Sequence, residues 1–78
     1  MPHRFQRESS ALRLLLDHRD ADDATLRAVV AQVGGTQRAI RVLFDEAYRL
    51  QVHGGSHAKI LKLVAISDRI DELARHGR

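Results

Sequence analysis

The only proline of this chain is Pro2, so no proline interrupts a helix anywhere in the rest of the sequence. Apolar residues recur at spacings of three and four over most of that length, which is the periodicity of helices that bury one face. Two glycine pairs, Gly34-Gly35 and Gly54-Gly55, interrupt the pattern in the way that helices commonly end. The sequence therefore predicts an all-α fold, a compact bundle of about four helices.

Each expected helix is preceded by a residue whose side chain is suited to cap it. The expected caps are, in chain order, Ser9 or Ser10, Asp20, Thr36 and Ser56. The first helix is expected to end before His18, and the last to run to about Arg75. The expected buried face of the third helix consists of Ile40, Leu43, Phe44, Ala47 and Leu50.

A chain of 78 residues is expected to form a single helical domain over residues 1–78, with residues 1–8 as a flexible basic arm. A core of this size contributes no more than about 3–5 kcal/mol, and small domains often add a disulfide, a metal or a partner chain. Because the chain contains no cysteine, disulfides and thiolate metal sites are excluded. We therefore expect a homodimer.

The fourth expected helix carries a stripe of large apolar residues whose spacing alternates between three and four, as in a short coiled-coil seam. The candidates for the dimer interface are Leu63, Ile66, Ile70 and Leu73. The alternative is that the stripe forms one wall of the domain's own core.

No apolar run is long enough to span a membrane, and the first residues lack the apolar stretch of a secretory signal. The expected location is therefore the cytoplasm.

The sequence contains no motif for nucleophilic catalysis or for phosphate binding by a glycine-rich loop. His53 and His57 are separated by Gly54-Gly55, so they do not share a continuous helix face, and no further metal ligand lies at suitable spacing. We therefore expect neither an enzyme nor a bound metal or cofactor.

The charge balance is mildly basic, with 13 Lys and Arg against 10 Asp and Glu, a net charge of +3 and a pI of about 10.2. Nearly all the cations are arginines, whose forked guanidinium suits contacts to phosphate and guanine. The composition of a GC-rich genome explains the same bias equally well.

Residues 26–45, LRAVVAQVGGTQRAIRVLFD, resemble the helix-turn-helix of small bacterial, plasmid and phage regulators. In that family a supporting helix ends at a glycine, a short turn follows, and a second helix enters the major groove of DNA. The resemblance makes Gly34 the turn glycine, with Ile40 and Leu43 anchoring the second helix. Val30 and Gly35 depart from the family pattern, which has a small residue and an aliphatic residue at these two positions.

The resemblance also implies which residues contact double-stranded DNA. The implied readers of base edges are Thr36, Gln37, Arg38 and Arg41. The implied contacts to the DNA backbone are Arg4, Arg7, Lys59 and Lys62.

The function expected from these features is a sequence-specific DNA-binding protein, a repressor or an accessory regulator from a plasmid or phage, acting as a homodimer on a palindromic site. The alternative is a small helical protein-protein interaction module, such as a phage-encoded inhibitor of a host complex or a recruitment domain. An unbroken basic and polar face over residues 36–49 favours DNA, whereas an exposed apolar surface favours a protein partner.

Overall fold

The computed structural model describes the backbone of residues 3–76 and the side chains of residues 10–76. This part of the chain consists of four helices: α1 (His3–Asp17), α2 (Asp23–Gln32), α3 (Thr36–Val52) and α4 (His57–His76). No strand is present between residues 3 and 76, so the predicted all-α fold is confirmed. No helix in this range is both long and apolar enough to cross a membrane.

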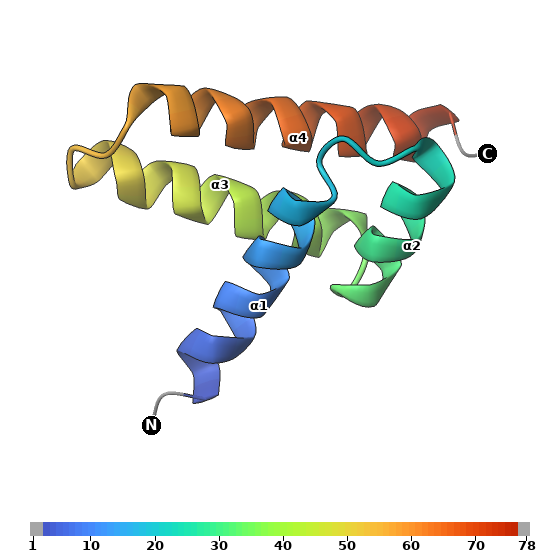
Figure 1. Cartoon of the computed structure of the whole chain (residues 1–78), viewed down its shortest axis with the longest axis horizontal. Coiled ribbons are helices and arrows are strands. Elements are labelled where there is room, and N and C mark those ends of the chain that lie inside the picture. The colour runs from blue at the N-terminus through green and yellow to red at the C-terminus, as the bar shows by residue number, and fades with distance from the viewer. Residues whose placement is uncertain (1–2, 77–78) are drawn as a thin grey trace.

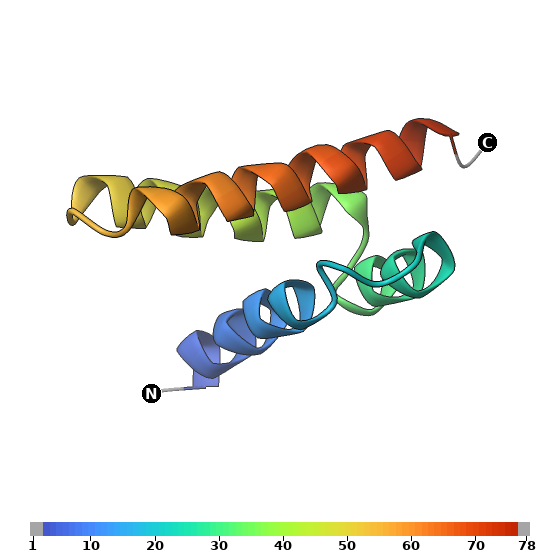
Figure 2. The same ribbon diagram turned by 45° about the horizontal axis from the view of Figure 1, so that its top comes forward.

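The helices form two layers. Helices α3 and α4 lie side by side and antiparallel, joined by the turn at residues 53–56 (Figure 1). Helices α1 and α2 lie together on one side of this pair (Figure 2). We call the end of the α3/α4 pair where α3 begins and α4 ends the base, and the end with the turn at residues 53–56 the tip. Helix α2 lies near the base. The tip projects beyond α1 and α2.

Each helix contributes one leucine with no exposed surface to the centre of the core. These residues are Leu15 in α1, Leu26 in α2, Leu43 in α3 and Leu63 in α4, each 0% exposed. Burying one such side chain stabilises the fold by roughly 1.5–3 kcal/mol. The core therefore joins all four helices where the two layers meet.

The apolar stripe of α4 belongs to this core, which corrects the predicted dimer interface. Leu63, Ile66 and Ile70 are at most 5% exposed in the single chain, and Leu73 packs partly buried against them. A second copy cannot contact the three buried side chains unless the domain opens. The stripe is thus the wall of the domain's own core.

Several helix starts differ from the predicted ones. Helix α1 begins at His3, earlier than the predicted start. Helix α2 is capped by Asp22, whose carboxylate accepts a hydrogen bond from the Thr25 backbone N–H at 2.9 Å. Hydrogen bonds from the Thr25 side chain and backbone lower the pKa of the Asp22 carboxyl below its usual value of 3.8. An anionic cap also complements the dipole at a helix start.

The starts of α3 and α4 differ from each other, although a glycine pair precedes both. Thr36 is not the cap of α3, because Gly35 holds that position and makes no side-chain hydrogen bond. Ser56 caps α4 as predicted, with its hydroxyl 3.4 Å from the Lys59 backbone N–H.

One side chain that the sequence did not single out ties α4 to the segment between α1 and α2. Arg69 donates hydrogen bonds to the backbone oxygens of Arg19, at 2.8 Å, and Ala21, and to the carboxylate of Asp23 at 3.1 Å. These contacts link residues 46 to 50 positions apart, so no local pattern could indicate them. Arg69 thereby holds the start of α2 against α4.

Candidate functional site

The turn between α2 and α3 has the length expected of a helix-turn-helix. It consists of Val33, Gly34 and Gly35, and the two glycines have φ values of +115° and +109°. Their backbone N–H groups close the end of α2 by donating to Ala31 at 3.2 Å and Val30 at 2.9 Å. Residues with a side chain rarely adopt these φ values, so both glycines are needed to redirect the chain.

The first two turns of α3 present a polar and basic outer face. Gln37, Arg38 and Arg41 are exposed. Ala39 and Leu43, on the opposite side of the helix, have no exposed surface. Residues three and four apart lie on one side of a helix, so these three side chains share a face. The structure thus brings three of the four predicted base readers together.

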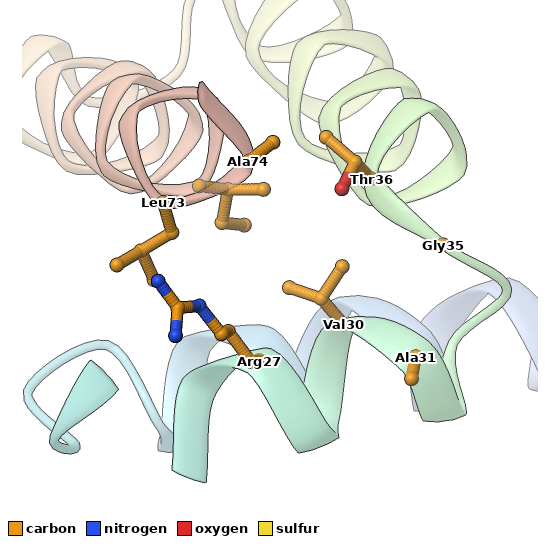
Figure 3. Close-up of a pocket in the computed structure, with 8 residues that line it drawn as sticks. Arg27, Val30, Ala31, Gly35, Thr36, Leu73 and Ala74 are labelled. Atoms are coloured by element: carbon orange, nitrogen blue, oxygen red, sulfur yellow. The ribbon is translucent and has the colours of Figure 1, made fainter. Parts of the chain in front are cut away.

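Thr36, the fourth predicted reader, lies elsewhere. It is half-buried and lines a cavity of about 350 Å³ between α2, the start of α3 and the end of α4. Figure 3 shows its hydroxyl directed toward the space that Val30 and Leu73 also line. Thr36 therefore does not extend from the outer face of α3, because the first residue of the helix faces its neighbouring helices.

Most ion pairs of the structure use arginines outside this face. The pairs are Arg19 with Asp20, Arg49 with Glu46, Arg69 with Asp23, and Arg75 with Asp71. The Arg49 pair is bidentate, and hydrogen bonding to Glu46 raises the pKa of Arg49. Within residues 10–76, Arg38 and Arg41 take part in no ion pair. Their guanidinium groups are available to an external anion.

The predicted backbone contacts are not gathered near this face. Lys59 and Lys62 are exposed in the first turns of α4, at the tip, whereas Arg38 and Arg41 lie near the base. Helix α3 has 17 residues and so separates its two ends by about 25 Å. The side chains of Arg4 and Arg7 lie outside the described part, so their role stays a prediction, while the backbone of residues 3–8, expected as part of a flexible arm, belongs to α1.

A second surface was not expected from the sequence. Phe44, Tyr48 and Val52 on α3 and Leu61 on α4 are 49%, 70%, 58% and 55% exposed. We call these four residues the apolar patch. Phe44 was predicted to be buried, and this was wrong. Helix α3 buries Leu43 and Ala47. Phe44 directly follows Leu43 in the helix and is therefore rotated by about 100° from it, away from the buried face.

Helix α3 thus carries two different outer surfaces, one basic near the base and one apolar toward the tip. In the described part of the chain, no group of three or more His, Cys, Asp or Glu side chains is placed to hold a metal ion. Compared with known proteins, the chain matches no family model, no curated protein sequence and no solved structure.

Proposed function

We propose that this chain is a small sequence-specific DNA-binding protein, a repressor or accessory regulator, that reads the major groove with the first two turns of α3. The observation that carries the proposal is the exposure of Gln37, Arg38 and Arg41 on one face, directly after a three-residue glycine turn. Helix-turn-helix proteins contact base edges with the same part of their second helix.

The three side chains have the chemistry of base recognition. An arginine can donate two hydrogen bonds to O6 and N7 of guanine, and a glutamine can pair with N6 and N7 of adenine. Neither Arg38 nor Arg41 has to leave an ion pair within residues 10–76 to do so. The start of α3 also has no side-chain cap at Gly35, and the free N–H groups of a helix start can donate to a phosphate.

Fluorescence anisotropy with random duplex DNA tests the proposal. Binding should weaken steeply as salt rises from about 50 to 200 mM, because neutralised phosphates release counterions. A selection for the preferred site would follow, and Arg38→Ala or Arg41→Ala should then each cost about 1–3 kcal/mol of binding free energy on that site.

The matched control is Arg75→Ala, which removes an exposed arginine of α4 that is paired with Asp71. Absence of binding at the lowest salt would refute the proposal. So would a loss for the two α3 variants that is no larger than the loss for Arg75→Ala.

The second candidate function is a helical protein-protein interaction module. The apolar patch favours it, because Phe44 and Tyr48 interrupt the polar face of α3 with exposed aromatic rings. This candidate predicts no DNA binding and a partner protein that is retained by the wild-type chain and lost with Tyr48→Glu. Salt-dependent DNA binding that requires Arg38 and Arg41 would argue against it.

A further inference from the structure

We propose that the apolar patch is the dimer interface of this protein and that its occupant is the same patch of a second copy. The proposal concerns a different surface from the stripe of α4, and it does not depend on DNA binding. Among residues 10–76, the four large apolar side chains with the greatest exposure all belong to this patch.

Three of the four side chains form one row along the tip half of α3, and the fourth, Leu61, lies on the neighbouring helix α4. Phe44, Tyr48 and Val52 are spaced at successive intervals of four residues, so they lie in a row along one side of α3. Tyr48 lies five residues before the turn at 53–56, and Leu61 lies five residues after it. Because α3 and α4 are antiparallel, Tyr48 and Leu61 are therefore level with each other.

The size of the patch fits a small dimer interface. An aromatic side chain can bury about 150–250 Å². Because Phe44, Tyr48 and Val52 are 49%, 70% and 58% exposed, the row on α3 offers roughly 300 Å² of apolar surface per chain. Two copies together reach roughly 600 Å², and polar neighbours, which supply nearly half of a typical interface, bring the total near the 1,200 Å² of the smaller specific interfaces. An apolar surface of this size is comparable to the largest patch of a typical monomer, and such patches are often functional.

The row on α3 is complementary to itself. If two α3 helices cross antiparallel about a two-fold axis at Tyr48, the two tyrosines meet at the axis and Phe44 of each copy meets Val52 of the other. Aromatic rings contribute more per contact than their area alone implies when they pack offset or edge to face. The arrangement is closed, so it produces dimers and no filaments.

The charges beside the row also suit a second copy. Arg49 is paired with Glu46, and Asp45 makes no ion pair within residues 10–76. The antiparallel arrangement brings Asp45 of each copy to within about one turn of Arg49 in the other, and no two like charges are set directly opposite. The exposed acid beside the patch thus gains a cation on association.

Sedimentation equilibrium of the full chain without DNA tests the inference. The mass should rise from one chain to two with concentration, and Tyr48→Glu should raise the dimer Kd by about 30-fold or more, as expected for a residue at the interface centre. Ala28→Glu is the matched control, because it adds the same charge at an exposed position of α2 and should leave the Kd unchanged. Circular dichroism would verify that both variants are folded.

Cysteine cross-linking tests the position of the axis independently. The chain has no cysteine, so Tyr48→Cys should form a disulfide-linked dimer under mild oxidation far faster than Ala28→Cys. A monomer at every concentration, with equal cross-linking of both variants, would overturn the inference and assign the patch to a different protein. A dimer that survives Tyr48→Glu would also overturn it, because the interface would then lie elsewhere.

Discussion

The two halves of α3 belong to one continuous helix but have opposite surroundings. The first half follows a glycine turn, packs near α2 and the end of α4, and exposes Gln37, Arg38 and Arg41. The second half extends toward the tip, beyond the cover of α1 and α2, and exposes Phe44 and Tyr48 (Figure 2). The comparison shows that an apolar side chain is buried only where its side of the helix meets a neighbouring helix.

The largest expected effect separates the buried face of α4 from its exposed face. Leu63 has no exposed surface, whereas Leu61 is 55% exposed only two positions earlier in α4. Leu63→Ala should lower the free energy of unfolding by about 2–5 kcal/mol, because it leaves a cavity in the core. Leu61→Ala should change it by about 0.5 kcal/mol or less in the monomer. Urea denaturation at low protein concentration measures both, and equal losses would mean that the patch is part of the core.

A crossed pair of substitutions tests whether the two halves of α3 work separately. Arg41→Ala should weaken binding to the preferred DNA site by about 1–3 kcal/mol and leave self-association unchanged. Phe44→Ala should weaken self-association, because it removes a ring from the patch while keeping the basic face intact. Anisotropy and sedimentation on both variants give the answer. Loss of both activities in each variant would show that the halves form a single surface.

The two glycine turns at the ends of α3 should differ in their tolerance of side chains. Gly35 has φ +109° and Gly54 has φ +76°, and an added Cβ would meet nothing within 4 Å at either position. Any difference therefore comes from the backbone alone. Gly35→Asn should lower the free energy of unfolding by about 1–3 kcal/mol, because a side chain is strained at that backbone conformation. Gly54→Asn should lower it by less than about 1 kcal/mol, because asparagine tolerates the left-handed region. Thermal denaturation should rank them in this order, and the reverse order would contradict the backbone argument.

The smallest expected effects concern the caps of α2 and α4, and they differ in pH dependence. The folded-state pKa of Asp22 lies below 3.8, so its carboxylate stabilises the fold above that value and loses this contribution as pH falls through the folded pKa. The deficit of Asp22→Ala relative to wild type should therefore shrink in acid.

Ser56 at the tip has no charge, so Ser56→Ala should lower the free energy of unfolding by about 0.5 kcal/mol at every pH. Melting temperatures of the two variants and wild type, recorded from neutral pH to below 3.8, compare the caps directly. An Asp22→Ala deficit that stays constant with pH would show that the negative charge plays no part in capping.

The sequence by itself determined the number of helices and where most of them stop. The glycine pairs stop α2 and α3, and both stops are closed by the same backbone hydrogen bond, from Gly35 to Val30 and from Gly55 to Leu50. Apolar spacing also identified Leu43 as inward-facing. These features are local, because capping, glycine conformation and helical periodicity depend on residues close together in the chain.

Only the tertiary structure decided which apolar faces are covered. It placed the stripe of α4 in the core, directed Thr36 into a cavity and left Phe44 exposed. Arg69 joins α4 to the segment before α2 through contacts between residues 46 to 50 positions apart. Periodicity shows that a helix has an apolar side, but the burial of that side depends on which other helix reaches it, and the packing of distant segments sets that.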